Sequence, residues 1–91
     1  MIYLDNSATT KPCAACVETM QHLLLRAWGN PSSVHQLGMD AERCLRTARG
    51  QVAKALGAEE GRVFFTSGGT EADNWAIFGT AERLAKRGRH I

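Results

Sequence analysis

Apolar positions recur at helical spacing in three stretches of the chain, and these stretches predict three helices. The first opens at Lys11-Pro12, since proline is tolerated in a first helical turn, and it ends before the helix-breaking residues 29–31. The second covers about residues 38–56, with Gly57 as its C′ residue, and the third about residues 70–86. One face of the second helix is apolar, and we expect it to be buried; its residues are Ala41, Cys44, Leu45, Ala48, Val52 and Leu56.

Short apolar runs beside these helices predict strands. The clearest run covers residues 62–66, and shorter ones cover residues 2–4 and residues 90–91. A strand set between helices indicates an α/β fold, but a parallel sheet needs several strands with both faces covered. We therefore expect the 91 residues to form the first helices and strands of a larger sheet domain, and to be incomplete as a domain.

A glycine turn joins the clearest strand to the third helix, in residues 66–74 (TSGGTEADN). The N–H groups of a helix start and the positive end of its dipole attract anions, and Gly68 and Gly69 let the backbone approach one closely. Neither the P-loop nor the dinucleotide fingerprint is present. The nearby carboxylates of Glu71 and Asp73 disfavour a nucleoside triphosphate, so a phosphate monoester is the easier guest. An ordinary connector, with both carboxylates stabilising the helix, stays open as the alternative.

Charge and cysteine content narrow the expected partners. The net charge is only +2, and the basic residues 86–90 suit the end of a helix, so no nucleic acid is expected. No apolar run approaches the roughly 20 residues that span a membrane, and no signal peptide is visible. Three cysteines do not suggest a disulfide framework, which favours the cytoplasm. The pair Cys13 and Cys16 suggests redox or metal chemistry, but packing is the favoured interpretation and no metal site is predicted.

Three motifs follow one another: residues 3–10 (YLDNSATT), 29–35 (GNPSSVH) and 65–74 (FTSGGTEADN). Their order resembles the N-terminal part of NifS-like cysteine desulfurases, of the class V aminotransferase family, over residues 2–91. The resemblance implies a pyridoxal-phosphate-dependent enzyme of fold type I. Such enzymes convert L-cysteine to L-alanine and carry the sulfur as a persulfide for iron–sulfur clusters or other acceptors. It also implies a homodimer and a sulfur-acceptor or scaffold partner.

The resemblance also implies roles for parts of the chain. About residues 1–28 would belong to the small-domain side and about residues 29–91 to the start of the large, cofactor-binding domain. The cofactor's phosphate would lie at Gly69 and Thr70, with Gly68 beside them. The residues implied on the substrate side are Asn6, Ala8, Thr9, Asn30 and His35.

No catalytic residue is expected within the chain. The Schiff-base lysine, the aspartate on the pyridinium nitrogen, the histidine stacked on the ring and the persulfide cysteine would all lie beyond Ile91. We therefore expect the chain alone to be inactive. Two alternatives remain: a non-catalytic phosphate-binding or dimerisation fragment, and a related enzyme acting on selenocysteine or another amino acid.

Overall fold

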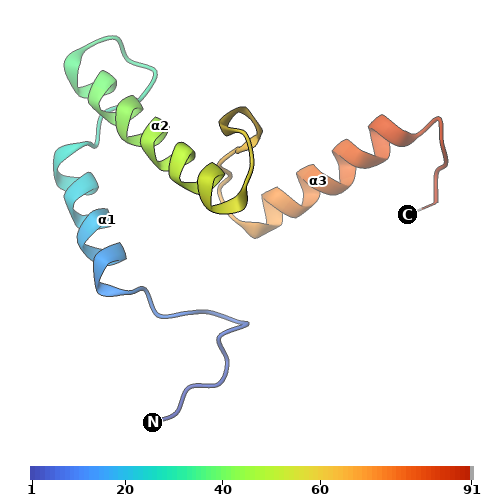
Figure 1. The fold of residues 1–91 in the computed structure, drawn as a ribbon, viewed down its shortest axis with the longest axis horizontal. Helices are drawn as coiled ribbons and strands as arrows, with labels where there is room; N and C mark the ends of the chain where they lie inside the picture. The colour runs from blue at the N-terminus through green and yellow to red at the C-terminus, as the bar shows by residue number, and fades with distance from the viewer. Residues whose placement is uncertain (91) are drawn as a thin grey trace. The chain divides into compact units, whose positions relative to one another are not determined.

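The computed structural model describes residues 1–90 and contains three α-helices and one short 3₁₀ helix (Figure 1). Their bounds are α1 Ala14–Arg26, α2 Gln36–Leu56, η1 Glu60–Arg62 and α3 Gly69–Leu84. The three predicted helices are thus confirmed, with ends that differ by at most a few residues. The chain divides into two units, Met1–Val52 and Ala53–Ile91. The division expected near residue 28 concerns a complete enzyme and stays a prediction.

No strand forms within residues 1–90, so the strands predicted at residues 2–4 and 62–66 are wrong for this chain. Arg62 ends the 3₁₀ helix η1, and Val63 follows with extended backbone, φ −102° and ψ 119°. Extended backbone counts as a strand only when a regular ladder of backbone hydrogen bonds joins it to a neighbouring segment, and no such ladder is formed within residues 1–90. His90 is not in a strand either, and Ile91 lies outside the described residues. The sheet of the expected α/β fold is therefore not present here.

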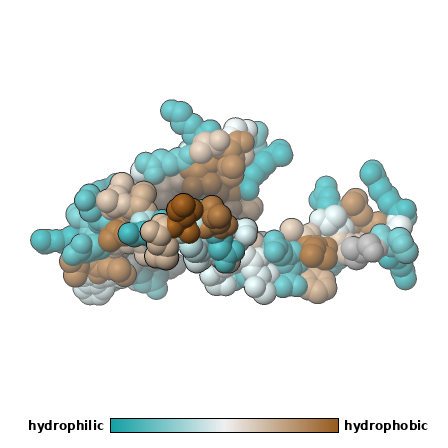
Figure 2. Space-filling view, turned by 90° about the horizontal axis from the view of Figure 1, so that it is seen from below, coloured by the Kyte–Doolittle hydropathy of each residue, from teal (hydrophilic) through white to brown (hydrophobic). Residues whose placement is uncertain are grey.

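Helix α1 keeps its apolar side chains at the surface, and none of its residues is buried. Val17, Met20 and Leu24 line an apolar groove of about 520 Å³ together with Pro12. Apolar residues, brown in Figure 2, are visible at the surface of the molecule. Cys13 and Cys16 are exposed as well, so the expectation that they pack is wrong in this chain. Within residues 1–90, the rest of the chain therefore covers this helix too little to bury any of its side chains.

Helix α2 buries little of the face that its sequence pattern predicts to be buried. Ala41 is buried at 6% exposure, but Leu45 and Val52 are 36% and 37% exposed, and Leu56 is 73% exposed. Cys44 is also exposed. Apart from Ala41, the buried apolar side chain among the described residues is Ala53, which the pattern did not single out. An amphipathic face is buried only against a second layer, and this chain supplies too little of one.

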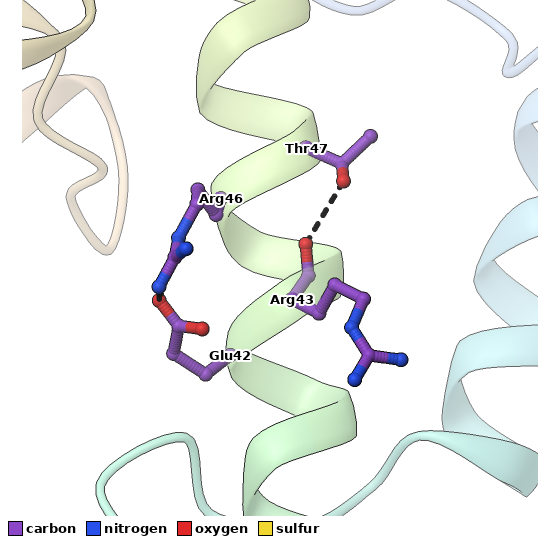
Figure 3. Close-up of polar contacts among 4 residues, drawn as sticks. All are labelled: Glu42, Arg43, Arg46 and Thr47. Carbon is purple, nitrogen blue, oxygen red and sulfur yellow. Dashed lines mark hydrogen bonds and ion pairs between the residues drawn. The ribbon is translucent and has the colours of Figure 1, made fainter.

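The polar side of α2 is held by local contacts within the helix (Figure 3). Arg46 pairs with Glu42, with Nη2 and Nε at 2.7 and 3.0 Å from the same carboxylate oxygen. The Thr47 hydroxyl donates to the Arg43 carbonyl at 2.9 Å. Because the ion pair is largely exposed, it contributes only about 0.3–0.5 kcal/mol to the helix. This side of α2 is therefore a solvent-exposed face.

Helix α2 ends in a Schellman motif in which Gly57 is the C′ residue. This glycine has φ +64°, and its N–H donates to the Lys54 carbonyl at 3.3 Å. The Ala58 N–H donates to the Ala53 carbonyl at 2.9 Å. These are the two bonds that define the motif, and they satisfy carbonyls that the helix end would leave unpaired. The predicted role of Gly57 as the C′ residue is confirmed.

Helix α3 likewise has no buried residue, although its sequence carries large apolar side chains. Phe64 packs edge-on against Trp75, with ring centroids 5.5 Å apart and an interplanar angle of 64°. A groove of about 700 Å³ runs beside this pair, and Arg62 and Arg83 contribute to its lining. Ile77 and Phe78 remain more than half exposed. The large apolar side chains of this helix are therefore mostly uncovered.

Candidate functional site

The start of α3 carries the predicted anion-binding residues. Gly68 is its N-cap, and its carbonyl accepts the first helical hydrogen bond, from the Ala72 N–H at 3.1 Å. The N–H groups of Gly69, Thr70 and Glu71 precede that bond, so they have no acceptor within the helix. No side chain caps this end. A Cβ added at Gly68 or Gly69 would meet no atom within 4 Å, so the backbone is open to the approach of a ligand.

Glu71 folds back from the first turn of α3 onto Ser67. The Ser67 N–H donates to Glu71 Oε2 at 3.1 Å, and the Ser67 hydroxyl donates to the same oxygen. These two bonds, the hydroxyl's first and the backbone's second, hold the pKa of the Glu71 carboxyl below its ordinary value. Because Ser67 is engaged, the donors left at the turn are the N–H groups of Gly69, Thr70 and Glu71 and the Thr70 hydroxyl.

This set of donors fits one phosphate monoester. Backbone N–H groups at a helix start, with a hydroxyl beside them, supply hydrogen bonds and a partial positive charge. The side-chain amide of Asn74 donates to the Thr70 carbonyl at 2.8 Å, one turn further along the helix. The groove beside Phe64 and Trp75 runs along the flank of α3, and its lining does not include residues 68–70. The groove is therefore separate from the residues that the sequence predicts to bind an anion.

The second motif forms a closed loop ahead of α2. Asn30 Oδ1 accepts a hydrogen bond from the Ser32 N–H, and the Asn30 carbonyl accepts one from the Ser33 N–H, both at 2.9 Å. A Cβ at Gly38 would collide with the carbonyl oxygens of Ser33 and Asn30. The loop thus lies directly against the first turn of α2, and the Asn30 side chain helps to hold it there.

His35 caps α2. Its Nδ1 accepts a hydrogen bond from the Gly38 N–H at 3.3 Å, and its carbonyl accepts one from the Met39 N–H at 3.0 Å. The first is the bond that an N-cap side chain makes to the third helical residue. Sequence reasoning placed His35 near a substrate and did not foresee the cap. The available signal was its position directly before an apolar-periodic segment.

The first motif forms a turn near the N-terminus. The Tyr3 hydroxyl lies 2.9 Å from the Asp5 carbonyl oxygen and 3.0 Å from that of Thr9. The Ala8 N–H donates to the Asp5 carbonyl at 3.1 Å, and the Thr10 hydroxyl donates to the Asn6 carbonyl at 3.2 Å. All of these residues are exposed. No hydrogen bond within the described chain uses the side chains of Asn6 and Thr9.

The predicted site residues fall into two groups, one in each unit. Asn6, Ala8, Thr9, Asn30 and His35 lie in the first unit, and Gly68, Gly69 and Thr70 lie in the second. The bond between Ser67 and Glu71 is a feature that sequence reasoning missed. A serine followed by a glutamate at the start of a helix resembles a capping box shifted by one residue, and this was the signal available.

Within residues 1–90, no three histidine, cysteine or acidic side chains stand close enough together to share a metal ion. None of the helices in this part of the chain has the length and apolar character needed to cross a bilayer.

Known proteins of one family match this chain over nearly its whole length. The family model described as "Aminotransferase class-V" matches residues 2–91. A NifS/IcsS protein homolog from Lactobacillus delbrueckii subsp. bulgaricus is 50% identical over 91 residues, which are 100% of this chain and 24% of that protein. The cysteine desulfurase IscS of Methanosarcina thermophila is 47% identical over 90 residues, 99% of this chain and 22% of its own length.

A selenocysteine lyase from Xenopus tropicalis is 47% identical over 83 residues, 91% of this chain and 19% of that protein. A search of solved structures finds none that matches. The chain thus spans only about a quarter of the relatives it resembles, between 19% and 24% in these three. The family match nevertheless covers every described residue after the first, and on that ground the chain belongs to the class-V aminotransferase family.

Proposed function

We propose that this chain is the N-terminal part of a pyridoxal-phosphate-dependent cysteine desulfurase. The complete enzyme would convert L-cysteine to L-alanine and hold the sulfur as a protein persulfide. The single observation that carries the proposal is the open start of α3, set in a sequence 47% identical to a cysteine desulfurase over 99% of the chain.

In this proposal the chain holds the cofactor by its phosphate. The N–H groups of Gly69 and Thr70, with the Thr70 hydroxyl, donate to the phosphate oxygens, and the bare backbone of Gly68 leaves room for them. When bound, pyridoxal phosphate supplies an electron sink for the reacting amino acid. The Glu71 carboxylate keeps its hydrogen bonds from the Ser67 N–H and hydroxyl, and the phosphate does not use these two donors.

The other predicted residues would shape the substrate side of the site. We assign Asn6, Ala8 and Thr9 to a segment beside the substrate. Asn30 and His35 would hold the loop that reaches the active site and the dimer contact. Their observed hydrogen bonds support a positioning role, since Asn30 closes the loop and His35 caps α2.

The larger assembly is part of the same proposal. We propose that the helices described here join the sheet of a fold type I domain in the complete protein. That protein would be a cytoplasmic homodimer that passes sulfur to an acceptor or scaffold protein, including those of iron–sulfur cluster assembly. The uncovered apolar surfaces of α1 and α3 support an incomplete domain, because exposed surfaces of this kind are rare in finished ones.

A chimera provides the main test. Residues 1–91 would replace the matching N-terminal segment of the Methanosarcina thermophila cysteine desulfurase, which keeps that enzyme's remaining chain. We expect the chimera to release sulfide from L-cysteine and the 91-residue chain alone to release none. A folded chimera that binds pyridoxal phosphate but leaves L-cysteine unchanged contradicts the proposed reaction, and so does desulfurase activity in the isolated chain.

The phosphate position is tested in the same chimera. We expect Thr70→Val to weaken pyridoxal phosphate binding by about tenfold, the loss of one hydrogen bond to a charged group. Thr80→Val, on the same helix but three turns away, is the matched control and should leave binding unchanged. Calorimetric titration of each apoprotein measures both, and equal affinities for the two variants would place the phosphate elsewhere.

A related activity on selenocysteine is the second candidate, because a relative named selenocysteine lyase is 47% identical over this segment. The segment therefore does not distinguish the two substrates. Supplying L-selenocysteine to the chimera and to its parent enzyme decides whether residues 1–91 change the preference. A ratio of the two rates that stays at the parent's value would remove this candidate for the segment.

A non-catalytic fragment that binds phosphate or interferes with dimers is the remaining alternative. The open start of α3 is the feature that favours it, since this end is present without a catalytic residue. Titration of the isolated chain with phosphate monoesters tests it directly. A chain with helical circular dichroism that binds none of them at millimolar concentration would exclude a phosphate-binding role.

A further inference from the structure

Three sulfur-containing residues follow one another at helical spacing at the start of α1, apart from every residue assigned above. Cys13 is the N-cap of the helix, and Cys16 lies in its first turn. Cys16 Sγ contacts Met20 Sδ at 3.9 Å, one turn further along the same face. Residues three and four apart on a helix are neighbours, with about 5–6 Å between their Cβ atoms. The Cys13, Cys16 and Met20 side chains therefore share one stripe, which we call the sulfur stripe.

The sulfur stripe is accessible and has no packing role in this chain. Cys13 and Cys16 are both exposed with unbridged thiols, and Met20 is 55% exposed. Their sequence pattern alone suggested burial, and within this chain the structure leaves these side chains exposed. Two thiols three residues apart with a thioether beside them make a set of soft ligands, and such ligands favour Cu(I), Zn²⁺ and iron–sulfur clusters over harder ions.

We propose that the sulfur stripe binds one Cu(I) ion through Cys13 Sγ, Cys16 Sγ and Met20 Sδ. Cu(I) is stable with two or three sulfur ligands, whereas a structural Zn²⁺ site takes four. The thioether also distinguishes a Cu(I) site from a redox switch made of two thiols, because a disulfide between Cys13 and Cys16 would not involve Met20. The assignment is independent of the proposed cysteine desulfurase activity.

The local charge suits the complex. On binding, both thiols lose a proton to solvent and the ion gains two thiolates and a neutral thioether, so the site changes no oxidation state and carries a net charge of −1. This charge lies at the start of α1, where the helix dipole favours anions. The first turn of α1 contains no acidic residue, and no side chain caps it, so nothing competes for that end.

Titration with Cu(I) itself, without oxygen and in competition with bathocuproine disulfonate, tests the proposal. We expect one Cu(I) per chain, an ultraviolet thiolate-to-copper absorption band and release of two protons per ion. Replacing either thiol, as Cys13→Ser or Cys16→Ser, should weaken binding by more than the roughly 100-fold that outer-shell changes reach, and Met20→Leu by roughly tenfold.

Cys44→Ser is the matched control, because Cys44 is another exposed thiol on a helix without a sulfur neighbour in contact. It should leave the affinity, the band and the proton count unchanged. The proposal is overturned if Cys13→Ser and Cys16→Ser bind as tightly as the unaltered chain. It is equally overturned if Cys44→Ser weakens binding, or if Met20→Leu leaves the affinity unchanged, since the ion would then use other ligands.

Discussion

Two glycine-containing segments lead into helices in this chain, and they are built in opposite ways. At the start of α2, Gly29 in the loop and Gly38 in the first helical turn lie so close to backbone atoms that a side chain would collide with them. At the start of α3, Gly68 at the N-cap and Gly69 at the first helical position have nothing within 4 Å of the place where a Cβ would stand. The start of α2 is capped by the side chain of His35, whereas the start of α3 has no side-chain cap.

The difference separates a structural use of glycine from a ligand-binding one. A glycine at a close backbone approach is needed for the fold itself, because a Cβ has nowhere to go. A glycine in open space at an uncapped helix start leaves N–H groups for a partner from outside. The two segments look alike as sequence, since each combines glycine, serine and asparagine or threonine, and only the contacts distinguish them.

The largest expected effect is at Gly38. Gly38→Ala should destabilise the loop and the first turns of α2 by about 1–3 kcal/mol, because the new Cβ overlaps two backbone carbonyl oxygens that belong to a packed loop. Amide hydrogen exchange along α2 measures this locally. Gly69→Ala is the control, and it should leave the exchange rates of α3 unchanged or lower them. If both variants loosen their helices equally, the contrast between the segments is wrong.

A smaller effect is expected at Gly57, where the backbone conformation matters and space does not. Gly57→Ala should cost about 1 kcal/mol, since φ is +64° and no atom lies within 4 Å of the new Cβ. Thermal unfolding followed by far-ultraviolet circular dichroism measures the loss. Gly61→Ala, with equally open surroundings and no positive φ, should cost less, and a larger loss there would contradict the argument.

Removal of the α2 cap should cause a still smaller loss of stability. His35→Ala should destabilise the start of α2 by about 0.5–1 kcal/mol, because the Gly38 N–H loses its acceptor. Carbon chemical shifts at residues 36–39 report the fraying. His35→Asn should restore most of the helix, since asparagine is a good N-cap residue. A loss that asparagine does not restore would mean that His35 acts through some contact other than the cap.

The smallest effect concerns Glu71, whose pKa is lowered by the Ser67 hydroxyl and, secondly, by the Ser67 N–H. A carboxyl with a lowered pKa in the folded chain stabilises it above the unfolded pKa, and this contribution is lost as the pH falls through the folded pKa. We therefore expect acid to loosen the start of α3. Ser67→Ala should raise the pKa of Glu71 toward its ordinary value, as carboxyl NMR titration would show.

Ser33→Ala is the control for that titration, because Ser33 belongs to the loop ahead of α2. It should leave the Glu71 titration curve in place. A Glu71 curve that is the same in the unaltered chain and in Ser67→Ala would mean that the bond to Ser67 is not maintained in solution. The start of α3 would then be open to anions on both sides.

Much of the local structure was predictable, for a physical reason that particular residues make clear. Helical periodicity and breakers such as Pro31 and Gly57 act over a few residues, so the positions of α1, α2 and α3 followed from the chain itself. The start of α3 was predicted in the same way, at about residue 70, one residue from its observed position at Gly69. The hydrogen bonds of Glu71 to Ser67 and of Gly38 to His35 were not, because several rotamers were open to each side chain.

The sequence by itself determined three helices, the glycine turn into α3 and, through its motifs, the class-V aminotransferase family. Only the tertiary structure decided which residues are covered. It left residues 62–66 without a strand and most of the apolar face of α2 exposed. It also showed that backbone atoms crowd the glycines at the start of α2 and leave those at the start of α3 in open space. Helices are stabilised by bonds within one segment, whereas strands and buried faces need atoms from another, and those contacts do not follow from local pattern.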